Sequence, residues 1–312
     1  MKKYLLSAVI LLAALTVQAQ KSVKITPTLK VGMQKTYITR GEATTSGSAA
    51  ADITGELVYK VDGKTANGYQ ISMVSKSTNI DANQVMQSLT TPDLMQMLNS
   101  IRVELLTDKK GAVTAIGNAE EVLGKCMAVM DSMFNATIAK SAELKNNPEA
   151  AATMQKSMGI MKEMFTENYL LESYAQTPGI TMLNGKTITD GMVEEGTFSP
   201  FFKTRTTYSL QNDGKTIVQV TEGDIDMESM KTYMSRMLSA MLPESVTKEA
   251  DPEQLTSVID NMISNGSMKM DMKRTATYDI ASDGWVKKMV MEMSMNMPGQ
   301  STKGRQEVVL KE

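Results

Sequence analysis

Residues 268–297 read MKMDMKRTATYDIASDGWVKKMVMEMSMNM, and two runs in this stretch place methionine at every second position. Side chains two positions apart project from the same face of a β-strand, so each run predicts a strand with one apolar face. Asp283-Gly284 between the runs supplies the positive-φ residues of a tight turn. We therefore expect an antiparallel hairpin in which Met268 to Ala281 pairs with Trp285 to Met297.

The two faces of this hairpin differ in chemistry. One face carries thioethers along both runs, from Met268, Met270, Met272, Met289, Met291, Met293, Met295 and Met297. The other face carries Lys269, Asp271, Lys273, Glu292 and Asn296, which we expect to be solvated.

Strand patterns continue on both sides of the hairpin. Apolar and polar residues alternate between residues 34 and 78, and a second hairpin is predicted over residues 101–116. Short extended runs separated by Asn-Gly and Asp-Gly turns return after Pro178, and a last strand passes through Val308 and Leu310. These patterns predict a sheet that is mostly antiparallel.

Helical spacing replaces strand alternation in three regions, residues 81–99, 118–170 and 226–264. Asn118 is expected to cap the second region, and Pro148 to begin its second helix, so that this region forms a helical hairpin. The third region carries a methionine stripe at spacings of three and four, Met227, Met230, Met234, Met237 and Met241.

Together these elements predict an α+β protein. We expect a curved, mostly antiparallel, half-barrel-like sheet that is covered on one face by the helices. Residues 20–312 form a single domain, with an N-terminal sheet portion (20–117), a helical hairpin (118–175) and a C-terminal portion of sheet and helix (176–312). The order hairpin, helix, hairpin at 51–116 recurs at 203–297, which fits a degenerate internal duplication or an ordinary alternation of strands and helices.

The first 19 residues have the pattern of a cleaved export signal. Lys2 and Lys3 precede an apolar run that ends at Val17, and Ala19 offers a small residue for cleavage. Removing this segment takes two of the 33 basic residues and none of the 35 acidic ones, which leaves a formal charge of −4. We therefore expect a periplasmic or extracellular protein without stable membrane insertion of the mature chain, and no nucleic-acid partner.

The composition excludes several kinds of chemistry. The chain has no histidine and one cysteine, so Ser-His-Asp catalysis, Cys-His catalysis, His-ligated zinc and an internal disulfide are absent. It carries no Gly-rich phosphate loop or dinucleotide fingerprint, and we expect no cofactor. The paired carboxylates Asp224 with Asp226 and Glu194 with Glu195 are better read as surface turns or caps than as an acid-base pair. Cys126 is better read as an inert core thiol than as a nucleophile.

The 29 methionines, against five phenylalanines and one tryptophan, are open to several interpretations. They form ordinary core, or they line an adaptable apolar cavity, because unbranched thioethers repack around ligands of different shape. They also resemble Met-x-Met sites for Cu(I), or sacrificial sites of oxidation. If they line a cavity, the lining residues are Met230, Met234, Met237, Met268, Met270, Met272, Met289, Met291, Met293 and Met295.

Three segments carry a resemblance to a known family: the signal that ends at Ala19-Gln20, the opening Leu29 to Tyr37, and the hairpin Tyr278 to Val286. They resemble an uncharacterised, exported, strand-rich family of Bacteroidota that has no assigned activity. Such proteins are similar to periplasmic half-barrel lipoprotein carriers, in which a curved antiparallel sheet wraps an apolar cavity beneath helices. The resemblance implies no catalytic residue.

From the residues and the resemblance we expect a non-enzymatic exported binding protein whose partner is an apolar small molecule or a lipid. The alternatives are a carboxylate-dependent hydrolase of an envelope polymer, a structural or envelope-interaction protein, and a Cu(I)-binding protein. The oligomeric state is not predicted.

Overall fold

The computed structural model describes residues 21–46, 51–81, 92–175, 179–198, 202–241, 257, 260–261, 271–297 and 299–311. The predicted signal, residues 1–19, lies outside the described residues, as do Met268 and Met270. Of the predicted helix after Pro252, only residues 257 and 260–261 are described, and they are helical.

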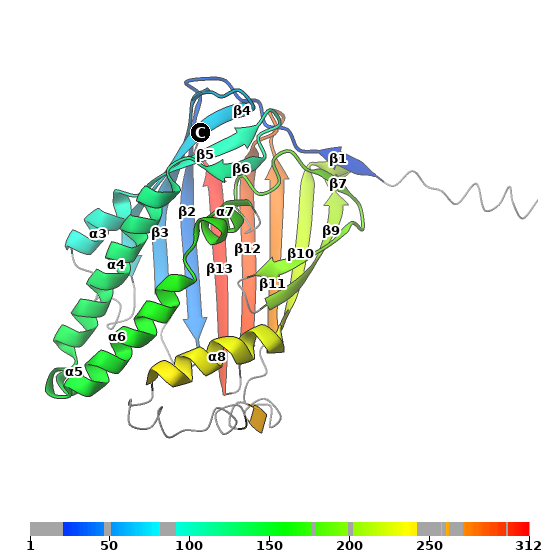
Figure 1. Cartoon of the computed structure of the whole chain (residues 1–312). Helices are drawn as coiled ribbons and strands as arrows, with labels where there is room; N and C mark the ends of the chain where they lie inside the picture. Colours follow the sequence, from blue (N-terminus) through cyan, green and yellow to red (C-terminus); the bar gives the residue numbers. More distant parts are fainter. Residues whose placement is uncertain are drawn as a thin grey trace, which may run out of the picture.

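A sheet of eleven strands forms the body of the protein (Figure 1). Its strands are β2 (Gln34–Thr45), β3 (Ala51–Lys64), β4 (Gly68–Asp81), β5 (Arg102–Asp108), β6 (Val113–Ile116), β8 (Val193–Phe198), β9 (Phe202–Gln211), β10 (Thr216–Ile225), β11 (Asp271–Ile280), β12 (Val286–Met297) and β13 (Gln300–Leu310). Each strand pairs antiparallel with its neighbours. A small second sheet joins β1 (Ser22–Lys24) to β7 (Thr187–Thr189).

Along the chain, strands β2 to β6 extend the sheet from its centre to one edge, and strands β8 to β13 extend it from the other edge back to the centre. The order is β6-β5-β4-β3-β2-β13-β12-β11-β10-β9-β8, so the first strand β2 pairs with the last strand β13. The sheet is curved and does not close, because β6 and β8 remain at opposite edges. The predicted α+β fold with a curved antiparallel sheet is thereby confirmed.

The helices of the described residues are α3 (Pro92–Asn99), α4 (Ala119–Lys140), α5 (Ala142–Asn146), α6 (Pro148–Glu163), α7 (Glu167–Ala175) and α8 (Met227–Met241), with a 3₁₀ turn η1 (Asn212–Gly214). Pro148 occupies the first turn of α6, and the side chain of Asn147 accepts a hydrogen bond from the Ala150 N–H. Proline suits this position because the first N–H groups of a helix have no partner within the helix.

The predicted helical hairpin is present as α4 and α6, which run side by side (Figure 1) and are joined by an ion pair between Asp131 and Lys162. The helical region does not continue unbroken to residue 170. α6 ends at Glu163, and Thr166 starts α7 by accepting a hydrogen bond from the Tyr169 N–H.

Asn118 precedes α4, but its side chain does not cap the helix as predicted. Its amide oxygen accepts a hydrogen bond from the Glu104 N–H at 2.9 Å, and its amide nitrogen donates to the Arg102 carbonyl at 2.9 Å. The side-chain amide of Asn118 therefore hydrogen-bonds to the backbone of β5 and does not cap α4.

The two halves of the sheet share one pattern. β4 and β5 pair with α3 between them in sequence, and β10 and β11 pair with α8 between them. The order strand, strand, helix, strand, strand thus recurs with the same antiparallel pairing. This topology accords with the recurrence read from the sequence, and an internal duplication stays a prediction.

Candidate ligand-binding site

Buried residues occur at every second position along the strands, so their side chains lie on one face of the sheet. We call this face the inner face. On β12 its members are Met289, Met291, Met293 and Met295, while Glu292 between them is exposed on the outer face. On β11, Asp271 and Lys273 are exposed on the outer face, as is Asn296 on β12. The predicted division of the hairpin into a methionine face and a solvated face is confirmed for the described residues.

Burial falls from one end of the inner face to the other. On β12, Met289 is 1% exposed, whereas Met291, Met293 and Met295 are only half-buried. On β3, Tyr59 is 4% exposed and Ile53, at the other end of the strand, is 45% exposed. On β12 and β3 the inner face is therefore filled at one end, the closed end, and incompletely covered at the other, the open end. On β11 the burial does not fall, because Met272 and Arg274, which pair with Met295 and Met293, are both buried.

The closed end is an ordinary core rich in aromatic residues. Tyr37 and Tyr59 meet edge to face with ring centres 5.9 Å apart, and Trp285 lies 6.3 Å from Tyr59. Side chains from α4 and α7, including Val122 and Leu170, complete this cluster. No space for a ligand is expected where packing is this complete.

The open end has a floor of very small residues. The floor consists of the inner-face positions Gly41, Ala43 and Gly304, and it is bordered by Ile53, Met291, Met293 and Met295. The polar residues Gln306 and Thr302 of β13 lie on the same face. Gly304 lies directly between Met293 and Ala43 in the pairing of β12, β13 and β2. Among the described atoms, a Cβ built on Gly304 would meet only the Glu42 carbonyl oxygen, at 3.6 Å. The described helices therefore place no side chain against this part of the floor.

α8 crosses the sheet at the open end, the lower end in Figure 1. Of its methionines, Met230 is buried, and Met234 and Met237 are half-buried. An ion pair between Arg236 and Glu163 links α8 to α6. A hollow of 530 Å³ lies between these two helices and is lined by Asn147, Glu149, Ala150, Thr153, Met154, Ser157 and Met237.

α6 does not cover the sheet. It has no buried residue, and its methionine Met161 is 37% exposed. The expectation that the whole region 118–170 covers one face is wrong for this helix, because α6 packs against α8 instead. Of its thioethers, that of Met154 lines the hollow shared with Met237 of α8.

A polar cluster adjoins the open end on the inner face of β8 to β11. It consists of Glu194, Thr206, Tyr208, Gln219, Thr221, Arg274 and Tyr278, with Lys186 beside it. Glu194 accepts a 2.6 Å hydrogen bond from the Tyr208 hydroxyl and forms a 3.0 Å ion pair with Lys186. The Thr206 and Thr221 hydroxyls are 2.9 Å apart, and the Tyr278 hydroxyl donates to Gln219 at 3.3 Å.

Burial governs the electrostatics of this cluster. It raises the pKa of Tyr208, as does the hydrogen bond to Glu194, and burial also raises the pKa of Tyr278. Both phenols therefore stay neutral at physiological pH. Arg274 is 6% exposed, and burial lowers its pKa, but a guanidinium remains charged in proteins. The cluster thus places a permanent positive charge next to the methionine surface.

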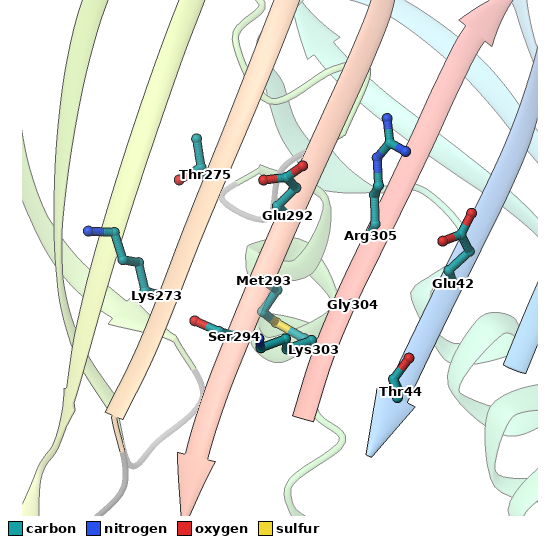
Figure 2. Close-up of a pocket in the computed structure, with 10 residues that line it drawn as sticks. All are labelled: Glu42, Thr44, Lys273, Thr275, Glu292, Met293, Ser294, Lys303, Gly304 and Arg305. Atoms are coloured by element: carbon teal, nitrogen blue, oxygen red, sulfur yellow. The ribbon is translucent and has the colours of Figure 1, made fainter. Parts of the chain in front are cut away.

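The outer face carries a second hollow, of 400 Å³, over β2, β13, β12 and β11. Figure 2 shows the side chains of Glu42, Arg305, Glu292 and Thr275 on adjacent strands of this face, with Lys273 and Lys303 nearby. An exposed mixture of acids and bases is what the solvated face of an antiparallel sheet usually carries.

The methionines predicted to line a cavity differ in burial. Met230, Met272 and Met289 are buried. Those half-buried and able to contact a ligand are Met234, Met237, Met291, Met293 and Met295. Met268 and Met270 lie outside the described residues, so their place in the lining stays a prediction.

The other candidates from the sequence do not form a catalytic arrangement in the described residues. Glu194 points to the inner face and Glu195 is exposed on the outer face, so these carboxylates are not a pair. Asp226 lies at the start of α8, where hydrogen bonds from Ser229 and Lys203 lower its pKa. Cys126 is half-buried, and burial raises the pKa of its thiol, as expected for an unreactive cysteine.

No group of three or more His, Cys, Asp or Glu side chains in the described residues is placed to hold a metal ion. No described helix has both the length and the apolar character that crossing a membrane requires.

Sequence reasoning missed Arg274, although a signal for it was available. Arg274 lies an even number of residues from Met272, Ala276 and Tyr278, so its side chain projects from the same face of the strand. The predicted strand therefore already placed a charge on the apolar face. It also missed the small residues of the floor, Gly304 and Ala43, because these contribute no hydrophobic pattern.

No family model and no curated protein matches the chain. A solved structure described as "lipid-protein interactions in lipovitellin" aligns with a TM-score of 0.38 and 10% identity, over 91% of this chain and 26% of that chain. The chain thus spans about a quarter of that protein. This TM-score does not establish a shared fold, and the resemblance to a Bacteroidota family stays a prediction.

Proposed function

We propose that this is a non-enzymatic binding protein for an apolar or lipid-like ligand, which lies between the open end of the inner face and α8. The observation that carries the proposal is the fall in burial along β12, from the fully buried Met289 to the half-buried Met293 and Met295. A face meant only as core would be covered along its whole length, because uncovered apolar surface costs about 25 cal/mol per Å².

The residues at the open end suit such a ligand. Three half-buried thioethers of β12 border a floor of glycine and alanine, which leaves space above the backbone. Methionine side chains are flexible and polarisable, so they adapt to ligands of different shape at little cost. The half-buried Met234 and Met237 of α8 supply the same kind of surface from the helix layer.

The test is binding of the neutral dye Nile red to the purified protein, followed by its fluorescence. Saturable binding is expected, and Ala43→Phe should weaken it at least tenfold because the ring would occupy the open end. Thr44→Phe is the matched control, since Thr44 is the next residue of β2 and is exposed on the outer face. Absence of saturable binding, or equal loss in both variants, would refute the proposed position of the ligand.

We also propose that the protein works in the periplasm or outside the cell, after loss of residues 1–19. The support is the pair Lys2 and Lys3 followed by the short apolar run to Val17. Cell fractionation with N-terminal sequencing should find a soluble protein that starts at Gln20. A membrane-bound form that retains Met1 would contradict this.

A further inference from the structure

The large sheet has two edge strands, and they differ in how they are covered. β6 forms one edge, and α7 packs against it. β8 forms the other edge, and its single strand neighbour among the described residues is β9. Val193 of β8 is 44% exposed, and Glu195, Gly196 and Thr197 are exposed as well. The side of β8 away from β9 is therefore open to solvent within the described part of the chain.

This free side of β8 presents backbone groups that β9 does not pair. The Tyr208 N–H donates a 2.9 Å hydrogen bond to the Met192 carbonyl, so the Met192 carbonyl points toward β9. In an antiparallel pair, successive residues turn their N–H and C=O groups alternately toward and away from the partner strand. The backbone groups of Val193, Glu195 and Thr197 therefore point away from β9, where a further extended segment can hydrogen-bond to them.

A row of alternating charges on the outer face of the sheet ends at this edge. The strand register places Arg205 of β9 between Glu195 of β8 and Glu222 of β10. Lys273 of β11 follows in the row and forms a 3.0 Å ion pair with Glu222. On its other side Glu195 has no strand neighbour among the described residues, so the row stops at an acid. A basic side chain on an added strand would continue the alternation, because opposite charges on adjacent strands attract.

The charge of β8 disfavours a second copy of the same strand as the occupant of this edge. The sequence of β8, VEEGTF, contains two acids and no base. Glu194 on the inner face already pairs with Lys186 at 3.0 Å, whereas Glu195 forms no ion pair within the described part of the chain. Charged side chains on an edge strand oppose its pairing with copies of itself. β8 therefore repels a second β8 and attracts a cationic segment.

We propose that β8 is a docking edge for an extended, basic segment of a partner protein. The segment adds to the sheet as a further strand and places a lysine or arginine opposite Glu195. Main-chain hydrogen bonds to the free side of β8 give the affinity, and the basic side chain gives the specificity. The six residues of β8 span roughly 20 Å at ~3.3 Å per residue, which is long enough to hold such a segment. This docking edge does not depend on the apolar ligand proposed above.

The test is fluorescence anisotropy of a labelled peptide, Thr-Val-Lys-Val-Lys-Val-Lys-Val-Thr, titrated with the purified protein. Saturable binding is expected, at least tenfold tighter than that of the same peptide with glutamine in place of lysine. Glu195→Lys should abolish this preference. Glu292→Lys is the matched control, because it makes the same change of charge on the same face of β12, a central strand. It should leave the preference intact.

N-methylated peptides test strand addition on the wild-type protein, so that this arm needs no variant. Lysines opposite Glu195 would direct their N–H groups toward β8, and the valines between them would direct theirs away. N-methylation of the lysines should therefore weaken binding at least tenfold, whereas N-methylation of the valines should leave it unchanged. Equal binding of the two N-methylated peptides would refute strand addition. Absence of saturable binding, equal binding of the lysine and glutamine peptides, or equal loss in Glu195→Lys and Glu292→Lys would refute the docking edge.

Discussion

The Tyr37 hydroxyl donates a 3.0 Å hydrogen bond to the carbonyl oxygen of Val286, and both residues are fully buried. Tyr37 belongs to β2 and Val286 to β12, and β13 lies between these strands in the sheet. The bond therefore spans the junction where the beginning and the end of the chain meet. It ties β2 to β12 across β13 at the closed end.

We predict that Tyr37→Phe lowers the free energy of unfolding by about 1 kcal/mol, because a buried carbonyl loses its donor while the ring packing is kept. Urea denaturation measures the change. Tyr69→Phe is the control, since the Tyr69 hydroxyl makes no hydrogen bond within the described part of the chain and Tyr69 is only half-buried. Equal effects in the two variants would mean that the bond to Val286 contributes nothing.

Alkaline pH should unfold the protein through its buried tyrosines. Burial raises the pKa of Tyr37, Tyr59, Tyr208 and Tyr278, and it raises the pKa of Tyr174 to about 12. Unfolded tyrosines titrate near pH ~10, so above that pH the unfolded state loses protons that the folded state keeps. Each such tyrosine lowers the free energy of unfolding by up to ~1.4 kcal/mol per pH unit.

The melting temperature should therefore show no loss from these groups below pH ~9 and fall steeply above pH ~10. Tyr59→Phe removes one of the titrating groups and should make the decline less steep. A melting temperature that stays level up to pH ~12 would show that these phenols are not protected in the folded state.

The strands were largely predictable because the signal is local. Period-two alternation and Gly-containing turns located β2 to β6 and β11 to β12, and Gly111, Gly185, Gly191 and Gly284 do adopt positive φ. The pairing of β2 with β13 was not predictable, since alternation gives the faces of a strand and not its partner. β13 is longer than predicted because its N-terminal half lies at the open end, where Thr302 and Gly304 replace the apolar residues of a buried strand.

The candidate site was predictable only in its methionines. The alternation on β12 correctly separated Met293 from Glu292, but it could not show that burial falls along the strand. That fall depends on which helices reach the sheet. α6 has a methionine stripe like that of α8, yet it has no buried residue. A stripe shows that a helix has an apolar side, whereas its contacts are decided by tertiary packing.

A side chain at Gly284 should destabilise the turn between β11 and β12. Its φ is +82°, and a Cβ there would lie 2.3 Å from the Thr26 carbonyl oxygen. Gly299 has a similar φ of +76°, but no described heavy atom lies within 4 Å of a Cβ built on it. Gly299→Ala should therefore cost only the backbone strain, about 1 kcal/mol. Gly284→Ala should cost ~2 kcal/mol more, because the Thr26 backbone must also move. Equal melting temperatures for the two variants would show that Thr26 is not held against the turn.

Cu(I) titration under reducing conditions distinguishes a metal site from an apolar surface. Met293 and Met295 lie on one face of β12, so a Cu(I) site would use them together and would bind one ion stoichiometrically. We expect no saturable binding, because the role proposed for these thioethers is that of an apolar surface. Sub-micromolar binding that is lost when both residues are replaced by leucine would overturn this expectation.

The fall in burial along β12 predicts unequal costs for equal truncations. Met289→Ala removes a side chain that is 1% exposed and should lower the free energy of unfolding by ~2–4 kcal/mol, through lost burial and the cavity left behind. Met293→Ala removes the same atoms from a half-buried position and should cost less than ~1.5 kcal/mol, because much of its surface is already in contact with water. Glu292→Lys, on the exposed outer face between them, should change stability by less than ~0.5 kcal/mol. The affinity for Nile red should show the opposite order, with Met293→Ala changing it more than Met289→Ala. If the two truncations cost the same, the inner face is filled evenly along its length and the proposed position of the ligand is wrong.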